Sequence, residues 1–220
     1  MNTGGKLYIC EIIGVYLILT LYYFIADHSS WFIAMPALFM GFATLAHSRQ
    51  GGWMIPAALF LSAIGDYQGS EHNFILQVSF FALAHIFYIA DFLPNRQLSK
   101  SNKLIAGIPF LYAVIFLAIL ISHMSNMVEI IAVSIYAAII ATMGASALTL
   151  NIKYKWWYVV AAMLFIFSDS VIVYNKYIEP ISNASLWIMT TYYAAQGLFA
   201  TLCLLRKQKY PRVYTRVQCC

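Results

Sequence analysis

Two aspartates lie deep inside apolar stretches of this 220-residue chain. Asp169 follows the apolar residues 161–167, and Asp66 follows the similar residues 57–64. An ionised side chain in the hydrocarbon region of a membrane costs at least about 2.5–3.5 kcal/mol, so such residues usually face a bundle interior or a watery cavity. Two buried carboxyl groups can divide the roles of proton donor and carboxylate between them. The pair therefore predicts acid and base chemistry inside a membrane.

The composition defines the class of protein that must position these acids. Hydrophobic residues make up 62% of the chain and charged residues 10%, whereas a soluble domain has about a quarter charged residues. The apolar runs are continuous and lack the alternation of a barrel strand. We therefore predict an all-α, polytopic, multi-pass integral membrane protein whose first partner is the lipid bilayer.

The basic residues and cysteines argue against two other kinds of partner. The formal charge is +5, but the Lys and Arg residues fall in short loops and form no predicted patch, so no nucleic acid is expected. The four cysteines lack the spacing of a zinc site, and we predict no metal and no cofactor. A divalent ion held between two carboxylates stays compatible with the sequence.

Eight segments are predicted to span the membrane, since each approaches the roughly 20 apolar residues that a crossing requires. All but one of the 13 Lys and Arg residues lie at alternate connections, and Lys176 is the exception. Because Lys and Arg accumulate in cytoplasmic loops, we place both termini in the cytoplasm. Residues 1–205 form one transmembrane domain, and residues 206–220 form a basic cytoplasmic tail. The predicted spans are residues 6–26, 31–47, 53–69, 73–92, 104–122, 127–150, 156–174 and 184–205.

This orientation gives the two acids a depth. Asp66 and Asp169 each lie thirteen residues after a tryptophan, Trp53 and Trp156, at the start of an outward-running span. At about 1.5 Å per residue, both carboxylates are predicted ~20 Å from the cytoplasmic face. They should share one level in the outer half of the membrane.

Further polar side chains interrupt the fourth and eighth predicted spans. His85 and Tyr88 share one face of the fourth span, and Tyr192 and Gln196 share one face of the eighth. A buried histidine is commonly a hydrogen-bonded core residue, and a buried amide commonly joins two helices. The buried histidine, His85, and the buried amide, Gln196, can equally line a site together with the acids. Asp91, close to Arg96 at a span end, is interpreted as an interfacial charge.

Four motifs follow one another along the predicted spans: Gly65-Asp66, Ala84-His85-Ile86-Phe87-Tyr88-Ile89, Phe167-Ser168-Asp169-Ser170 with Asn175-Lys176-Tyr177 after it, and Thr191-Tyr192-Tyr193-Ala194-Ala195-Gln196. In this order they resemble the YhhN family of lysoplasmalogenases. The resemblance extends over residues 31–205. One departure is Met35-Pro36, where family members often have Lys-Pro.

The resemblance implies a hydrolase that cleaves the vinyl ether bond of a lysoplasmalogen, a lysophospholipid substrate. The products are a fatty aldehyde and a glycerophosphoethanolamine or glycerophosphocholine. A vinyl ether opens when an acid protonates its β-carbon, and water then captures the oxocarbenium ion. This chemistry requires a protonated carboxyl group, a carboxylate and a place for water.

These demands assign roles to the residues of the motifs. Asp66 and Asp169 are the predicted acid and base, with either order possible, and His85 is predicted to orient them or to relay a proton. The predicted substrate contacts are Ser168, Asn175, Tyr88, Tyr192 and Gln196.

The competing class of function is transport, because buried acids with a histidine and a glutamine can also relay protons or bind a cation. Transporters often have helices broken at the membrane midplane, whereas Pro36, Pro56 and Pro109 lie near predicted span starts. Intramembrane aspartic proteolysis is a third interpretation. It is disfavoured because residues 63–66 lack the first glycine of a GxGD motif.

Overall fold

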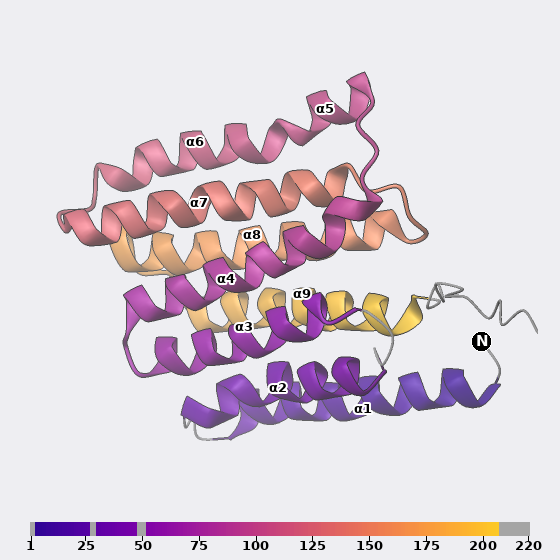
Figure 1. The fold of residues 1–220 in the computed structure, drawn as a ribbon. Helices are drawn as coiled ribbons and strands as arrows, with labels where there is room; N and C mark the ends of the chain where they lie inside the picture. The colour runs from indigo at the N-terminus through magenta and orange to yellow at the C-terminus, as the bar shows by residue number, and fades with distance from the viewer. Residues whose placement is uncertain (1–2, 27–29, 48–51, 207–220) are drawn as a thin grey trace, which may run out of the picture.

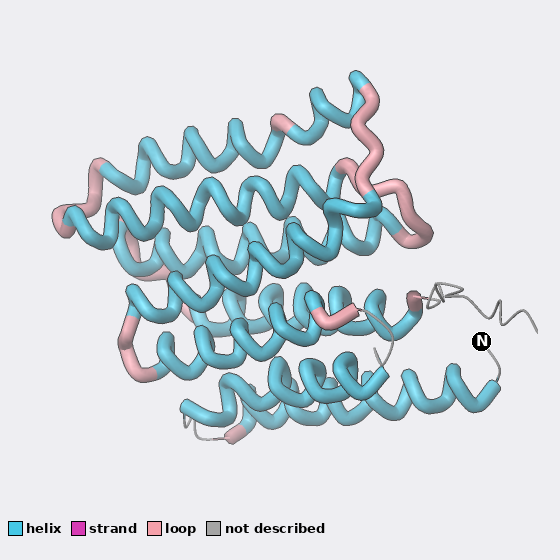
Figure 2. Tube along the Cα trace, in the orientation of Figure 1, coloured by secondary structure: helices cyan, strands magenta, loops and turns pink. Residues whose placement is uncertain are grey.

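A computed structural model describes residues 3–26, 30–47 and 52–206, which fold into helices without any β-strand (Figures 1 and 2). A single 3-10 turn, Leu93–Asn95, follows the fourth helix. The predicted tail from residue 207 onward lies outside the described residues. The α-helices are α1 (Thr3–Ile25), α2 (Ser30–His47), α3 (Met54–Ser70), α4 (Phe74–Phe92), α5 (Lys100–Ala106), α6 (Ile108–Ile121), α7 (Met127–Leu148), α8 (Lys155–Tyr177) and α9 (Ala184–Leu205).

The helices match the predicted spans closely, with one difference in the fifth. There the chain forms two helices, α5 and α6, which meet at Gly107. Pro109 occupies the first turn of α6, where its missing N–H group costs nothing. The α5–α6 segment still counts as a single apolar stretch, Lys100–Ile121.

Six helical segments of the described chain are long and apolar enough to cross a membrane. Residues Trp31–His47 of α2 form a shorter apolar helix. Helix α3, with 17 residues, is short and carries Ser62, Asp66 and Gln68. The prediction of an all-α polytopic membrane protein is confirmed, and the count of eight spans stays a prediction.

Five of the helices form a closed ring. Each of α3, α4, α7, α8 and α9 packs against the next, and α9 returns to α3. Helices α1 and α2 cover the ring beside α9 and α3, and α6 lies outside it against α7 and α8. Helix α1 begins and α9 ends at the same end of the bundle (Figure 1). The placement of that end in the cytoplasm remains a prediction.

Unlike a soluble protein, the bundle exposes large apolar side chains on its outside and buries several polar side chains inside. The outer faces of α1 and α6 expose large apolar side chains, among them Ile18 and Val114, each 66% exposed. The side chains of all five tryptophans are exposed near helix starts, where indoles favour the headgroup level of a bilayer. The buried polar residues, by contrast, are Thr44, Ser62, Asp66, His85, Ser146, Thr149, Ser168, Asp169 and Gln196.

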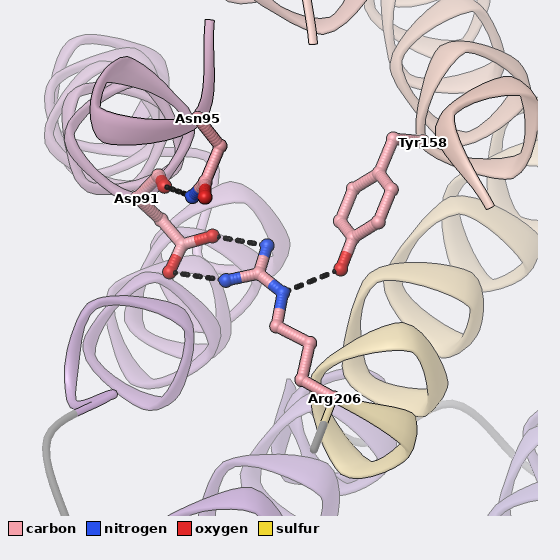
Figure 3. A network of polar contacts seen from close by, with 4 residues as sticks. All are labelled: Asp91, Asn95, Tyr158 and Arg206. Atoms are coloured by element: carbon pink, nitrogen blue, oxygen red, sulfur yellow. Dashed lines mark hydrogen bonds and ion pairs between the residues drawn. The ribbon is translucent and has the colours of Figure 1, made fainter. Parts of the chain in front are cut away.

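A buried ion pair fastens the end of α9 to the ring (Figure 3). The Arg206 guanidinium donates through Nη1 to Asp91 Oδ1 at 2.9 Å, and its Nη2 lies 2.5 Å from Oδ2. Arg206 Nε also donates to the Tyr158 hydroxyl at 2.7 Å. Asp91 is thus paired with Arg206, while Arg96 donates to the Thr149 hydroxyl at 2.8 Å.

We predict that Asp91 and Arg206 are energetically coupled. The Asp91 side chain is 8% exposed, so Arg206→Gln leaves a buried charge unpaired and should cost about 2 kcal/mol or more. In a double-mutant cycle, Asp91→Asn combined with Arg206→Gln should lose clearly less stability than the two single losses added together. Thermal unfolding in detergent measures this. Simple additivity of the two losses would contradict the coupling.

Candidate active site

One continuous chain of hydrogen bonds crosses the ring from α4 to α3. The Tyr88 hydroxyl donates to Gln196 Oε1 at 3.1 Å, and Gln196 Nε2 donates to the Tyr192 hydroxyl at 2.7 Å. Tyr192 in turn donates to Asp66 Oδ2 at 2.8 Å. Because Tyr192 accepts from the amide, its own proton is directed at the carboxylate. Four of the predicted site residues therefore form a single connected unit.

The local sequence explains how this unit is assembled. Tyr192 and Gln196 are one turn apart on α9, so their side chains lie on the same face of the helix. Gly65, immediately before Asp66, lets α4 approach α3: a Cβ atom there would meet the Phe81 ring at 2.8 Å. An unpartnered buried amide or hydroxyl costs about 1–3 kcal/mol. The chain of bonds avoids that cost for side chains that are almost fully buried.

Asp169 has a different environment on the opposite side of the ring. It is 7% exposed, and its Oδ2 accepts a hydrogen bond from the Tyr136 hydroxyl of α7. Its other oxygen, Oδ1, is buried and has no hydrogen-bond partner among the described residues. Tyr136 is a site residue that the sequence motifs did not reveal. A buried carboxylate requires a donor, but the sequence does not show which span supplies it.

His85 has one nitrogen fixed and one open. Its Nδ1 lies 2.6 Å from the Phe81 carbonyl oxygen, which can only accept, so Nδ1 carries the hydrogen. In the neutral ring, Nε2 then presents a lone pair. Nε2 is buried, and no described residue bonds to it. His85 is therefore set up to accept a proton or a hydrogen bond from a molecule that enters the ring.

An aromatic cluster, defined here as Phe165, His85, Tyr136 and Tyr192, links the tyrosine partners of the two acids. The Phe165 ring lies 4.9 Å from His85 and 5.4 Å from Tyr192, centroid to centroid. The His85 ring lies 5.6 Å from Tyr136. The two acids therefore belong to one neighbourhood of the ring interior.

The two acids nevertheless line separate cavities. Asp66, together with Ser168 and Tyr192, lines a cavity of about 140 Å³, whose walls also include the polar side chains of Ser70 and Gln77. Asp169 lines a cavity of about 50 Å³ among apolar side chains of α6, α7 and α8. Because the consecutive residues Ser168 and Asp169 face different cavities, α8 separates them.

The two remaining predicted substrate contacts, Ser168 and Asn175, lie in different places. Ser168 donates to the Ile188 carbonyl at 3.1 Å and lines the Asp66 cavity. Asn175 lies apart from both cavities, and its Oδ1 accepts from the Ile181 backbone N–H at 2.8 Å, which fixes the turn after α8. Its contact with substrate stays a prediction. Within the described part of the chain, no three His, Cys, Asp or Glu side chains are grouped to hold a metal ion.

The fold and the site define a class: a polytopic helical membrane protein whose interior holds two acids and a histidine with an open nitrogen. Comparison with known sequences identifies the family within this class. Residues 28–202 match the YhhN family, and the chain belongs to that family. The resemblance seen in the motifs is confirmed.

Named relatives are 29–33% identical to this chain over the parts that align. The human protein "Lysoplasmalogenase TMEM86B" is 31% identical over 187 residues, which cover 82% of this chain and 78% of the human protein. The rat protein of the same name is 33% identical over 70% of this chain and 62% of its own length. A Mycobacterium tuberculosis "Lysoplasmalogenase" is 29% identical over 76% of this chain and 67% of its own length. No solved structure matches the chain.

We predict that the amide of Gln196 stabilises the site more than an ordinary polar side chain does. Gln196→Leu removes two buried hydrogen bonds, which leaves the Tyr88 hydroxyl without a partner and the Tyr192 hydroxyl without its donor, so it should lower stability by about 2–3 kcal/mol. Gln77→Leu is the matched control, because Gln77 is half-buried and lies outside the chain of bonds. Thermal unfolding of both variants in detergent compares them. Equal losses of stability in the two variants would show that the hydrogen-bonded unit adds no stability beyond that of an ordinary polar side chain.

Proposed function

We propose that this protein is a lysoplasmalogenase that hydrolyses the vinyl ether of a lysoplasmalogen by means of its two buried aspartates. The observation that carries the proposal is the unequal partnering of these acids. Asp66 is held at the end of a chain of hydrogen bonds, whereas Asp169 has a buried oxygen with no partner among the described residues. Vinyl ether hydrolysis needs a proton donor and is helped by a base, and two carboxyl groups in different surroundings can divide these roles.

Asp169 suits the role of the acid. A carboxyl group among apolar side chains is favoured in its neutral, protonated form. Its Oδ1, which has no partner among the described residues, can carry that proton beside the apolar cavity that Asp169 lines. In the first step the O–H proton moves to the β-carbon of the vinyl ether, whose π electrons form the new C–H bond. The ether oxygen then shares the positive charge of the resulting oxocarbenium ion.

Asp66 suits the role of the carboxylate. Its Oδ2 accepts a hydrogen bond from Tyr192, as Asp169 Oδ2 does from Tyr136. However, the Asp66 cavity also holds the polar side chains of Ser70 and Gln77, which favour the ionised form more than the apolar lining beside Asp169 does. A carboxylate can stabilise the cation and take a proton from the attacking water, as paired acids do in glycoside hydrolysis. Water adds to the cationic carbon and forms a hemiacetal. The hemiacetal collapses to the aldehyde, and the glycerol oxygen leaves with a proton.

The aromatic cluster would lie where the cation forms. Aromatic faces attract cations, and the effect increases when water is excluded. The open Nε2 of His85, which belongs to this cluster, can receive the proton of the water or return it to the leaving oxygen. This mechanism requires the side chains of the cluster to move when substrate binds, so that a vinyl ether at the cluster reaches both acids from the two sides of α8. The Asp66 cavity, which has Ser70 and Gln77 in its wall, would then receive the glycerol side of the lipid.

Transport receives no comparable support from the geometry. The helices that carry the two acids, α3 and α8, run unbroken through Met54–Ser70 and Lys155–Tyr177. Broken helices at the binding site are a common feature of transporters. Hydrolysis is therefore the function that the site supports best.

The direct test is to incubate the purified protein with a vinyl ether lysophospholipid and to measure fatty aldehyde. We expect aldehyde from the vinyl ether and no cleavage of its acyl ester or saturated alkyl ether analogues, because only the vinyl ether has a carbon that can be protonated. A chelator should leave the rate unchanged. Absence of aldehyde, or release of fatty acid from the ester, would contradict the proposal.

A further inference from the structure

Two adjoining cavities form an apolar groove between α6 and α8. The inner cavity is the one that Asp169 lines, and the outer cavity has a volume of about 380 Å³. Both are lined by Tyr112, Phe116 and Ser170, so these three residues mark the border between them. We call the two cavities together the α6–α8 groove.

The groove opens on the side of the bundle, toward lipid. Helix α6 lies outside the ring, next to α7 at the edge of the bundle (Figure 1). In the most apolar part of the α5–α6 segment 11% of the residues are buried, against 50% in α7, α8 and α9. Tyr112, Phe167 and Trp187, which line the outer cavity, are 43%, 46% and 55% exposed. The outer cavity is therefore accessible from the hydrocarbon region.

The border between the two cavities is made by side chains. The Tyr112 hydroxyl donates to Ser170 Oγ at 2.8 Å, and Ser170 Oγ donates to the Ile166 carbonyl at 2.7 Å. The Phe116 ring stacks on Tyr112 with centroids 5.7 Å apart. Rotation of side chains on α6 can join the cavities without breaking a helix, since no backbone hydrogen bond crosses this border.

The inner end of the groove holds an unsatisfied polar atom. Asp169 is more than nine-tenths buried, and its Oδ1 has no partner among the described residues. Such an atom requires an explanation in a structure whose other buried site residues are mostly bonded. A ligand that entered by the groove and passed Tyr112 and Ser170 would reach Asp169 at the inner end.

We infer that the α6–α8 groove binds the single hydrocarbon chain of an ether lysolipid that enters sideways from the bilayer. The apolar lining excludes the phosphate headgroup, and the polar side chains of the Asp66 cavity, Ser70 and Gln77, suit hydroxyl groups instead. The two ends of a lysolipid thus find matching surroundings on opposite sides of α8. This inference rests on the proposed function for the identity of the lipid.

A photoreactive lipid tests the groove independently of catalysis. The probe is a saturated 1-O-alkyl lysophospholipid with a diazirine at the end of its chain, which the enzyme is not expected to cleave. After irradiation of the full-length protein in lipid vesicles, mass spectrometry should locate the label on peptides of α6 and α8, near Tyr112 and Tyr174. Label on α1 or α2 instead would overturn the inference.

A matched pair of variants on α6 makes the test sharper. Ala113 lines the inner cavity, whereas Ala118 is exposed on the outer surface of the same helix. Ala113→Phe should fill the groove and reduce labelling about tenfold, and Ala118→Phe should leave it unchanged. Equal labelling of the two variants would contradict a chain site here, and unfolding temperatures identify any variant that fails to fold.

The outcome separates this inference from the proposed function. Label in the groove without aldehyde release from a vinyl ether lysolipid would retain the lipid site and reject the hydrolase. Aldehyde release with label outside the groove would retain the hydrolase and reject this route for the chain.

Discussion

The need to partner polar groups in an apolar interior is the constraint on which this structure depends. Asp66, Tyr192, Gln196 and Tyr88 are each nearly inaccessible, and every one of them is hydrogen-bonded to the next. Buried polar networks are stabilising only when their members are satisfied. Helices α4, α9 and α3 of the ring are therefore joined by the same side chains that we assign to the chemistry. Asp91 and Arg206 apply the same principle at the end of the bundle.

Departures from this rule mark the working parts of the site. Asp169 Oδ1 and His85 Nε2 are buried atoms with no partner among the described residues. His85 belongs to the aromatic cluster and Asp169 is bonded to its Tyr136, and the proposed chemistry would hold the vinyl ether at this cluster. A substrate and a water molecule would complete their hydrogen bonding. Ser62 Oγ and Ser146 Oγ are also buried without a partner, but only Asp169 and His85 among these four belong to the proposed site, and their incomplete bonding fits a site that is completed when lipid binds.

Much of this site could be predicted from sequence because a charge in an apolar helix is conspicuous. Asp66, Asp169 and His85 were found in that way, and helical spacing placed Tyr192 with Gln196. Pairings between distant helices could not be predicted. Tyr136 as the donor to Asp169, and Arg206 as the partner of Asp91, depend on how α7 and α9 pack, and no local pattern encodes that packing. The separation of the acids by α8 and the break at Gly107 likewise became evident only in three dimensions.

The most direct test of the account is the turnover of a vinyl ether lysolipid by Asp66→Asn and Asp169→Asn proteins that are shown to be folded. Each substitution keeps the shape of the side chain and removes its acid–base function. A general acid or base typically contributes about 10²–10⁴-fold to a rate, so each variant should lose that much in kcat. Folded Asp91→Asn, which alters a buried aspartate outside the site, should retain turnover. Near-normal aldehyde release by either site variant would contradict the two-acid mechanism.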